Sequence, residues 1–413
     1  MKIEDTSIER ALCSLSLKGV QYLTDWWTTF GFDDSRNRFY GEVYNDNTPN
    51  PASSLMVIQR ARILWFFSTI SQLEKFSDYK IYADIQYKEL ITYFHDKTFG
   101  GFIWEVNKDY TIINNRKQTY AQAFCIYALS EYYLLSKDED AKSLALETFD
   151  LLEKKTWDSK NDGYIEAMDH RWSHMSDMRL SPKDKNEPKT MNTHLHILEA
   201  YTTLCKISYT EEVTKSLVRV LGLYSDRFHN KNNNHFHLFF DNEWNLKSNI
   251  ISYGHDIESS WLMHEAAEMS NDLALQSKMN TLVLSIANNI LDNGLSVDGG
   301  VKNEIHDSIA DASFDWWPQA EAVIGFINAY QISGEIKFID ASNKCLEFIQ
   351  NYFIGANNDE WYWKITEDLK PVDDISKSNG WKAPYHNGRM YVEILARFEN
   401  SSSYTNDKSK EYS

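Results

Sequence analysis

The chain has 413 residues, of which 42% are hydrophobic and 14% aromatic. That composition supplies a large core and excludes a disordered chain, although the polar residues 401–413 look frayed. The 42 Lys and Arg residues against 60 Asp and Glu residues give a net charge of −18. A strongly acidic surface repels nucleic acid and anionic lipid, so neither is an expected partner.

Targeting signals and disulfides are not expected from the sequence. No run approaches the roughly 18 apolar residues of a membrane-spanning helix. The N-terminal stretch MKIEDTSIER is acidic where a signal peptide would carry basic and then apolar residues. The four cysteines are scattered and form no CxxC motif: Cys13, Cys125, Cys205 and Cys345. We therefore expect free buried thiols and a cytoplasmic protein.

Apolar residues recur with the helical period over most of the chain, separated by polar loops rich in glycine and aromatic residues. The pattern predicts twelve helices, at residues 7–30, 54–76, 78–95, 117–136, 139–156, 190–207, 210–228, 255–270, 272–292, 316–333, 335–353 and 385–399. The joins between these helices alternate in length. Joins such as 137–138 and 208–210 are short, whereas every second join is long.

The six long loops are copies of one repeat. Equivalent places in the loops are marked by Gly41, Gly101, Gly163, His237, Gly300 and Trp361, which are 60, 62, 74, 63 and 61 residues apart. One period holds a helix pair and one long loop, which is typical of stacked helical pairs. Six pairs form either an open solenoid or a closed ring. We favour an (α/α)6 barrel, because the first and last units lack polar caps. No Pro- or Ser-rich linker interrupts residues 1–400, so we expect a single domain there.

Polar and aromatic side chains gather at the start of the helix that follows each long loop. They are Arg62 in QRARILWFF, Tyr120 in KQTYAQAF, Asn192 and His196 in KTMNTHLHILEAY, His255 and Glu258 in SYGHDIESSWL, Trp316 and Glu321 in FDWWPQAEA, and Trp381 and His386 in NGWKAPYHNGRM. In a barrel whose long loops share one end, these groups point to the same end of the axis. Packing alone gives no reason for this placement, so the sequence predicts a pocket there.

Several of these residues also have a structural interpretation. Arg62 suits a buried ion pair, because Arg60 and Arg62 flank an apolar helix. Tyr120, Trp316 and Trp381 suit a hydrophobic core as well as a cleft in which sugar faces stack on aromatic rings. The residue types alone leave both interpretations open.

The histidines are the residues best suited to catalysis. His194 and His196 are two apart and point to different sides of a helix, so at most one faces the pocket and the other is a core histidine. His255 and Glu258 are three apart and share a face, as in a carboxylate that orients an imidazole or in a structural hydrogen bond. Zinc is a third alternative, but no HExxH motif and no nearby cysteine supports it.

Four motifs in order, NTHLHILEAY, YGHDIESSWL, WWPQAEA and WKAPYHNGRM, resemble those of the N-acylglucosamine 2-epimerase superfamily and most of all its cellobiose 2-epimerase branch. The resemblance runs from Arg60 to Arg389. It implies an (α/α)6 barrel that inverts C2 of a reducing-end sugar without cofactor or metal. The residues that match are the histidines His196, His255 and His386 and the sugar contacts Arg62, Tyr120, Asp184, Asn192, Glu258, Trp316, Glu321 and Trp381.

The chemistry implied by the resemblance suits these residue types. Epimerisation at C2 of an aldose requires ring opening and removal of the C2 proton, which the C1 carbonyl acidifies. The resulting cis-enediol rotates about C2–C3 and takes a proton on its other face. Two bases on opposite sides of C2 are therefore expected, and histidine exchanges protons near neutral pH. We expect His255 and His386 to be this pair, with the order of abstraction open.

Further roles follow from that assignment. His196 assists ring opening, Arg62 stabilises the oxyanion on O1 or O2, and Glu258 orients His255. The N-terminus of the helix that begins near His255 is expected to lower the pKa of this imidazole and keep it neutral. A Trp381 that stacks on a second sugar would favour disaccharides. We expect a sugar as the partner and a monomer as the oligomeric state.

Other functions stay open at this point. Mannose 2-epimerases, mannose isomerases and N-acylglucosamine 2-epimerases share the histidines, so the motifs barely separate them. An (α/α)6 glycoside hydrolase would use two carboxylates such as Asp184 and Glu321, but hydrolysis needs no histidine at the mouth of the barrel. A sugar-binding barrel without activity is least expected, because binding alone gives no reason for bases on two sides.

Overall fold

The computed structural model of the protein describes residues 2–355 and 359–407. Within these ranges the twelve predicted helices are present and alternate between an inner and an outer position. The inner helices are α2 (Val57–Ile70), α4 (Thr119–Ser136), α6 (Met191–Ile207), α8 (Tyr253–Met269), α10 (Trp316–Ser333) and α12 (His386–Asp407). The outer helices are α1 (Lys2–Thr29), α3 (Lys80–Glu89), α5 (Glu139–Lys155), α7 (Glu211–Leu223), α9 (Leu273–Asn289) and α11 (Ile336–Phe348).

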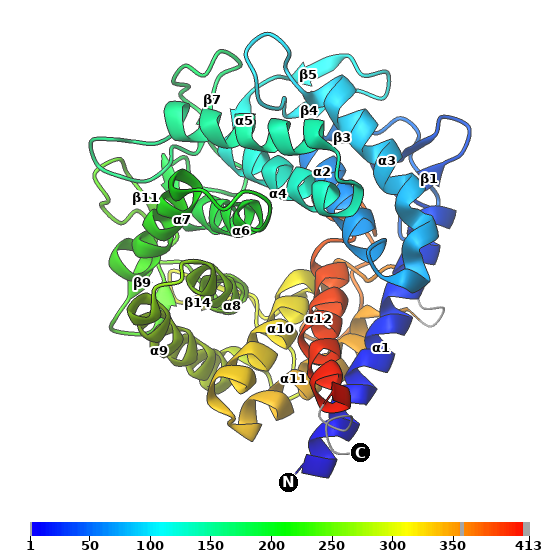
Figure 1. Cartoon of the computed structure of the whole chain (residues 1–413), viewed down its shortest axis with the longest axis vertical. Helices are drawn as coiled ribbons and strands as arrows, with labels where there is room; N and C mark the ends of the chain where they lie inside the picture. The colour runs from blue at the N-terminus through cyan, green and yellow to red at the C-terminus, as the bar shows by residue number, and fades with distance from the viewer. Residues whose placement is uncertain (1, 356–358, 408–413) are drawn as a thin grey trace.

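The inner helices close into a ring. Each packs against the next, from α2 through α4, α6, α8 and α10 to α12, and α12 returns to α2. Figure 1 shows this ring along its axis, with α1 in blue beside α12 in red, although these helices come from opposite ends of the chain. The (α/α)6 barrel predicted from the repeat is therefore confirmed.

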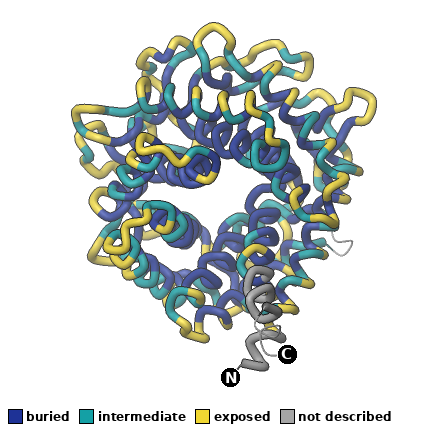
Figure 2. The backbone as a smooth tube through the Cα atoms, viewed as in Figure 1, coloured by how far each residue is buried: buried dark blue, intermediate teal, exposed yellow. Residues whose placement is uncertain are grey.

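The two sets of helices differ in sequence because they differ in surroundings. Inner helices are buried almost all round, and in α2 every residue except Thr69 is buried. Outer helices are amphipathic, as in α7, where Val213, Leu217, Val220 and Leu221 form one buried face. Figure 2 shows buried backbone along the inner helices and exposed backbone mainly at the periphery. The largest part of the hydrophobic core therefore lies between the two sets.

Several predicted boundaries differ from the structure. The predicted helix 54–76 is divided, because α2 ends at Ile70 and a separate 3₁₀ helix, Glu74–Tyr79, follows. The polar stretch that begins at residue 401 continues α12 as far as Asp407, since neither proline nor glycine interrupts it. Residues 408–413 lie outside the described residues.

Short antiparallel strands join the long loops around one end of the ring. They are β1 (Phe32–Asp33), β2 (Arg38–Phe39), β3 (Leu55–Met56), β4 (Glu105–Val106), β5 (Ile112–Asn114), β6 (Lys117–Gln118), β7 (Ala167–Met168), β8 (Lys189–Thr190), β9 (His229–Asn230), β10 (His235–Phe236), β11 (Phe239–Phe240), β12 (Ile251–Ser252), β13 (Glu304–His306), β14 (Ile309–Ala310), β15 (Phe314–Asp315) and β16 (Lys364–Ile365). The strand before an inner helix pairs with one in the next long loop: β3 with β4, β6 with β7, β8 with β11, β12 with β13, and β15 with β16. A bridge between Val43 and Ser378 joins the first loop to the last, so the loops form one continuous rim.

A second repeated contact holds the loops against the inner helices. Gln122, the fourth residue of α4, accepts from the backbone N–H of Phe102 at 2.7 Å and donates to its carbonyl oxygen at 2.8 Å. Gln319 makes the same pair of bonds at the fourth position of α10. His194 occupies this position in α6, where its Nε2 accepts from the backbone N–H of Tyr164 at 2.9 Å. The core histidine of the predicted pair is therefore His194.

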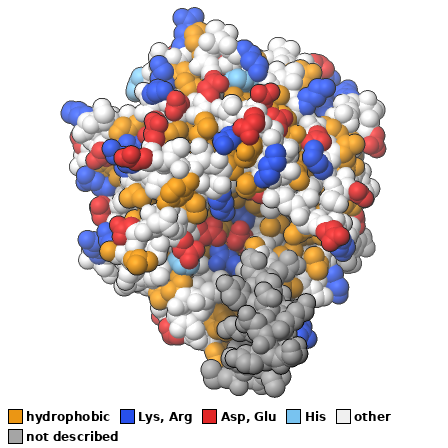
Figure 3. Space-filling view, viewed as in Figure 1, with side chains coloured by type: hydrophobic (Ala, Val, Ile, Leu, Met, Phe, Trp, Pro, Cys, Tyr) orange, Lys and Arg blue, Asp and Glu red, His pale blue; other side chains and the backbone are white. Residues whose placement is uncertain are grey.

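The molecular surface shows how the acidic excess is distributed. On the face drawn in Figure 3, acidic and basic side chains lie interspersed rather than in one patch of a single sign. Among the residues that the structure describes, no helix has the length and apolar character needed to span a membrane.

Candidate active site

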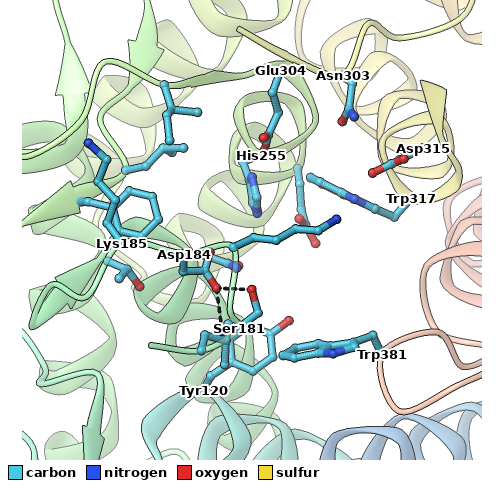
Figure 4. Close-up of a pocket in the computed structure, with 18 of the residues that line it drawn as sticks. Tyr120, Ser181, Asp184, Lys185, His255, Asn303, Glu304, Asp315, Trp317 and Trp381 are labelled. Carbon is cyan, nitrogen blue, oxygen red and sulfur yellow. Dashed lines mark hydrogen bonds between the residues drawn. The ribbon is translucent and has the colours of Figure 1, made fainter. Parts of the chain in front are cut away.

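The long loops and the N-terminal ends of the inner helices enclose a cavity of about 600 Å³. Every inner helix contributes to its wall, with Arg62 from α2, Tyr120 from α4, His196 from α6, His255 from α8, Trp316 from α10 and His386 from α12. Figure 4 shows His255, Trp317 and Trp381 reaching into this space from different sides. The cavity lies at the end of the barrel where the sequence predicts a pocket.

His386 is the first residue of α12 and is 6% exposed. Its Nδ1 lies 2.6 Å from Oε1 of Glu321 on α10. Because a carboxylate engages Nδ1, the other ring nitrogen is the one available to a ligand. Burial lowers the pKa of His386 well below its usual value, and the positive charges of Arg62 and Arg389 lower it further. The imidazole is therefore neutral and able to accept a proton.

His255 is the third residue of α8, so the start of the helix places it at the cavity. Its Nδ1 lies 2.8 Å from Oγ of Ser252 on β12, and its ring packs against that of Trp317 with centroids 4.6 Å apart. Burial, followed by the charge of His196, lowers the pKa of His255 to about 3. The predicted direction of the shift is confirmed, but burial rather than the helix terminus is its main cause.

His196 lies on α6 and is 3% exposed. Its Nδ1 is 2.9 Å from Oε2 of Glu199, one helical turn later. Its ring packs edge-on against that of Tyr120 at 4.8 Å, and the Tyr120 hydroxyl accepts from Nη2 of Arg62 at 2.8 Å. These contacts hold an imidazole, a phenol and a guanidinium together on one wall of the cavity.

Arg62 is placed to bind an oxygen atom of a ligand. Its guanidinium donates to the Tyr120 hydroxyl and to the backbone oxygen of Trp381, while its buried Nε has no partner among the described residues. The buried ion pair considered for this helix belongs instead to Arg60, whose Nη1 lies 3.3 Å from Oε2 of Glu89. Arg62 therefore retains donor capacity toward the cavity.

The remaining wall is aromatic and polar. Trp381 lies in the loop before α12, with its ring 5.9 Å from that of Trp104. Asn192 Oδ1 and Trp316 Nε1 are buried and have no hydrogen-bond partner within the described residues. Asp184, in the loop between β7 and β8, accepts at 2.7 Å from both the N–H and the hydroxyl of Ser181 (Figure 4). Unpartnered polar atoms beside aromatic rings suit a ligand rich in hydroxyl groups.

Four inner helices meet in a buried charge cluster next to the cavity. Arg389, on α12, is fully buried and donates to Glu199 on α6 and to the Tyr385 hydroxyl. From Nη2 it also donates to Glu258 on α8 at 2.5 Å and to Glu321 on α10 at 2.7 Å. Arg389, Glu199, Glu258 and Glu321 are called the Arg389 cluster below.

The carboxylates of the Arg389 cluster differ in their proton affinity. Burial and the proximity of Glu321 raise the pKa of Glu258 to about 7, and burial raises that of Glu321 to about 7 as well. Burial opposes the ionisation of Glu199, but Arg389 and His196 outweigh it and lower the pKa of Glu199 to about 2. Glu199 is thus ionised near neutral pH, while the other two carboxylates are close to their midpoints.

The structure gives two predicted site residues other partners than those expected. Glu258 binds Arg389, whereas the Nδ1 of His255, which Glu258 was expected to orient, is next to Ser252. Glu321, expected to contact sugar, is fully buried and holds His386 instead. Ten of the eleven predicted site residues line the cavity, and Glu321 is the exception.

The sequence-based prediction missed several residues of this region, among them Glu199, Arg389 and Trp317. Glu199 and Arg389 are charged residues within otherwise apolar helical stretches, which is the signal that would have found them. Trp317 contacts the rings of both His255 and His386, with centroids 4.6 and 5.7 Å away. Trp317 is next to Trp316 in the same motif, and the sequence gave no reason to choose Trp317 over Trp316 as a site residue.

One group of side chains near the cavity has the composition of a metal site. Glu258, Glu321 and His386 have ligand atoms within 4.8 Å of one another. However, Nη2 of Arg389 lies 2.5 and 2.7 Å from the two carboxylates and supplies the positive charge between them. These residues fit an arginine-centred cluster better than a metal centre.

The chain matches known proteins over most of its length. Residues 39–387 match the family described as N-acylglucosamine 2-epimerase (GlcNAc 2-epimerase). The cellobiose 2-epimerase of Bacteroides fragilis is 37% identical over 372 residues, which cover 90% of this chain and 95% of that protein. The cellobiose 2-epimerase of Ruminococcus albus is 38% identical over 366 residues, which cover 88% of this chain and 93% of that protein.

Solved structures agree with these matches. The cellobiose 2-epimerase of Bacillus thermoamylovorans has a TM-score of 0.89 at 31% identity, covering 95% of this chain and all of that one. A sugar epimerase from a ruminal bacterium has a TM-score of 0.88 at 36% identity, covering 93% of this chain and 99% of that one. A D-mannose isomerase at 17% identity and a TM-score of 0.81 shares the fold. Sequence and fold together show that the chain belongs to the N-acylglucosamine 2-epimerase family.

Proposed function

We propose that the protein is a sugar 2-epimerase that inverts C2 of the reducing-end residue of a β-1,4-linked disaccharide, converting cellobiose to glucosyl-mannose. The observation that carries this proposal is the convergence of three histidines, from α6, α8 and α12, on one aromatic-walled cavity. Relatives named cellobiose 2-epimerase at 37% and 38% identity support the choice of substrate.

The first step is opening of the pyranose ring. The O1–H proton leaves, O5 gains a proton as the C1–O5 bond breaks, and an open-chain aldehyde results. His196 serves this step, because Glu199 fixes its Nδ1 at 2.9 Å and leaves the opposite nitrogen for the sugar. An imidazole with a carboxylate behind it can take up and return a proton without moving.

The second step is proton transfer at C2. One histidine removes the C2 proton, the C–H electron pair forms the C1–C2 double bond, and negative charge moves to O1. The Arg62 guanidinium stabilises this charge. After rotation about C2–C3, the other histidine, which has to carry a proton in this direction of the reaction, gives it to the opposite face of C2, so the two imidazoles exchange protonation states. His255 and His386 are the pair, since α8 and α12 lie two positions apart in the ring. Each of them acts as the base in one direction of the reaction.

The other lining residues bind and orient the sugar. Asn192 and Trp316 offer polar atoms that lack protein partners. Trp381 provides an aromatic face for the second sugar ring, and Asp184 accepts hydrogen bonds from hydroxyl groups. The chemistry needs no cofactor, because the substrate's own carbonyl acidifies the C2 proton.

Incubation of the purified protein with cellobiose, mannobiose, mannose and N-acetylglucosamine, followed by chromatography, tests the proposal. The expected result is glucosyl-mannose from cellobiose, absent from a parallel preparation of the His386→Asn variant. Free glucose from cellobiose would indicate a glycoside hydrolase instead. Conversion of mannose to fructose without any change in cellobiose would indicate an isomerase.

We also infer that the enzyme is a cytoplasmic monomer. Cys125, Cys205 and Cys345 are buried free thiols, which suits a reducing compartment. Light scattering of the eluted protein measures the oligomeric state directly, and a stable dimer would contradict that part of the inference.

A further inference from the structure

His196 and His386 are joined by an unbroken chain of charged contacts. Nδ1 of His196 lies 2.9 Å from Glu199, and Nδ1 of His386 lies 2.6 Å from Glu321. Both carboxylates bind the same guanidinium, that of Arg389. Of the three histidines that the inner helices bring to the cavity, two are therefore held by one cluster.

The third histidine stands apart from this arrangement. Nδ1 of His255 faces the hydroxyl of Ser252 at 2.8 Å, and a hydroxyl carries no net charge. A change of charge within the Arg389 cluster therefore reaches His255 only through space. This difference makes His255 an internal reference for the two coupled histidines.

Charge is unevenly balanced within the cluster. Glu199, Glu258 and Glu321 all bind Arg389, so three carboxylates share one guanidinium. All four side chains are at most 3% exposed, so water screens them little. The remaining negative charge has to be balanced by protons, either on a carboxylate or on a histidine bonded to one.

Sharing a single guanidinium links the two histidines. When His196 gains a proton, its ion pair with Glu199 strengthens, and the interaction of Glu199 with Arg389 weakens. The guanidinium then neutralises Glu321 more completely, and Glu321 stabilises a positive charge on His386 less well. The same sequence of events runs in the opposite direction when His386 gains a proton.

We propose that the Arg389 cluster couples the two histidines, so that a proton on one disfavours a proton on the other. The role of this coupling in catalysis rests on the proposed function. While His196 holds the O1 proton during ring opening, the coupling keeps His386 neutral, so that His386 is available as the base for the C2 proton. Arg389, Glu199 and Glu321 are positioning residues in this scheme, because they act through the histidines.

The test is a double-mutant cycle read from the titration of His196 by NMR, with histidine rings labelled with ¹³C in the full-length protein and no sugar present. The groups around His196 that bear on its titration are Arg62, Tyr120, Glu199, His255, Glu258, Glu321, Tyr385, His386 and Arg389. The variants are Glu321→Gln, Glu199→Gln and the double variant. Glu321 has no contact with His196, so any effect of its substitution must pass through the cluster or through space.

We expect Glu321→Gln to lower the titration midpoint of His196 by about one pH unit, because Arg389 then neutralises Glu199 more fully. In the Glu199→Gln background the same substitution should lower the midpoint by less than half as much. An equal shift in both backgrounds would show that the coupling acts only through space and would overturn the proposal. The absence of a shift in the first background would overturn it too.

A second variant covers the case in which Glu321→Gln does not fold. Trp261 donates to Oε2 of Glu321 at 3.0 Å. Trp261→Phe removes this donor, so the interaction of Glu321 with Arg389 strengthens and Arg389 neutralises the charge of Glu199 less. The His196 midpoint should then rise, which is the opposite sign, and a fall would contradict the coupling. Glu268→Gln, an exposed carboxylate on the same helix as Glu258, is the control and should leave the midpoint unchanged. Because no turnover is measured, failure of this test is separate from failure to epimerise cellobiose.

Discussion

The two ends of the barrel use their polar groups in different ways. At the loop end, Asn192 and Trp316 line a cavity and each has a polar atom without a partner among the described residues. Toward the opposite end of the inner helices, the half-buried Arg397 lies 2.8 Å from Glu265 and 3.3 Å from Glu393, so charges pair with one another. The comparison teaches that a charged group packed between helices does not by itself mark a site. A site is marked where long loops leave polar groups unpaired around an open space.

Helix α8 contains both situations. His255, in its first turn, lines the cavity, and its Nδ1 faces only a serine hydroxyl. His264, farther along the same helix, has Nδ1 2.8 Å from the amide oxygen of Asn328 and Nε2 3.8 Å from Glu268. The two histidines therefore form a matched pair for mutagenesis, one at each end of the barrel.

Replacement of either proposed base should have the largest effect on activity. His386→Asn and His255→Asn should each reduce conversion of cellobiose by about 10²–10⁴-fold, the range for loss of a general acid or base. His264→Asn should retain nearly full activity. Turnover in D₂O, followed by NMR at C2, measures all three variants.

Deuterium exchange separates the two faces of C2 in the same experiment. At least one of the inactive variants should still introduce deuterium at C2 of unconverted substrate, because the surviving histidine can exchange the proton on its own face. A single variant with near-normal epimerisation would show that one base suffices. The residue concerned would then have a structural role, and its replacement would affect activity as little as replacement of His264.

Loss of the aromatic wall should have a smaller and substrate-dependent effect. The backbone around Trp381 is held independently of its ring, because the adjacent Lys382 is fully buried and donates to Glu360 at 2.9 Å. Trp381→Ala should therefore act locally. By loose analogy with base–aromatic stacking, it should raise the activation free energy of the reaction with cellobiose by about 1–3 kcal/mol. Turnover of mannose by the same variant is the control and should change much less. Equal losses with both sugars would place Trp381 at the reducing-end sugar.

Local periodicity was sufficient to predict the helices and their sixfold repeat. Helical hydrophobic patterns extend over whole elements, and anchors such as Gly101 and Gly163 recur at the same place in each loop. The pairing of the loops was not predictable, because most strands are only two residues long and bind partners in another repeat. A two-residue strand has no alternation that a sequence pattern could reveal.

The site residues likewise divide into those that local motifs reveal and those that depend on partners distant in the sequence. The three histidines could be placed at the cavity because each lies within the first two turns of an inner helix, inside a recognisable motif. The partner of Glu258 could not be found, because its spacing from His255 suggested a local contact while Arg389 lies 131 residues away. Ser252, three residues before His255, was an equally local alternative, and composition did not distinguish the two.

The charges at the far end of the barrel should affect stability rather than catalysis. Burial and the neighbouring Glu265 raise the pKa of Glu393 to about 7. An unfolded glutamate titrates near 4.3, so between about pH 4.3 and 7 the folded chain binds more protons than the unfolded chain. The contribution of Glu393 to the free energy of unfolding therefore falls as the pH rises through this interval.

Glu393→Gln removes this titration. The variant's Tm minus the wild-type Tm should increase by an amount on the order of 2 °C from pH 5 to pH 7.5. Epimerisation at neutral pH should stay the same. Thermal unfolding of both proteins across this range is the measurement. Parallel pH profiles of Tm would show that Glu393 keeps an ordinary pKa, and a large loss of activity would tie it to the cavity.

Removal of divalent metal ions should have the smallest effect of all. The carboxylates of Glu258 and Glu321 and the ring of His386 are close enough to hold a cation, but the Arg389 guanidinium binds both carboxylates. A metal ion would have to displace a fully buried arginine and leave its charge without a partner, which is strongly unfavourable. Conversion of cellobiose should therefore be the same after dialysis against EDTA as before it. Loss of activity that Mg²⁺, Mn²⁺ or Zn²⁺ restores would show that the cation at this end of the barrel is a metal and that Arg389 moves aside to admit it.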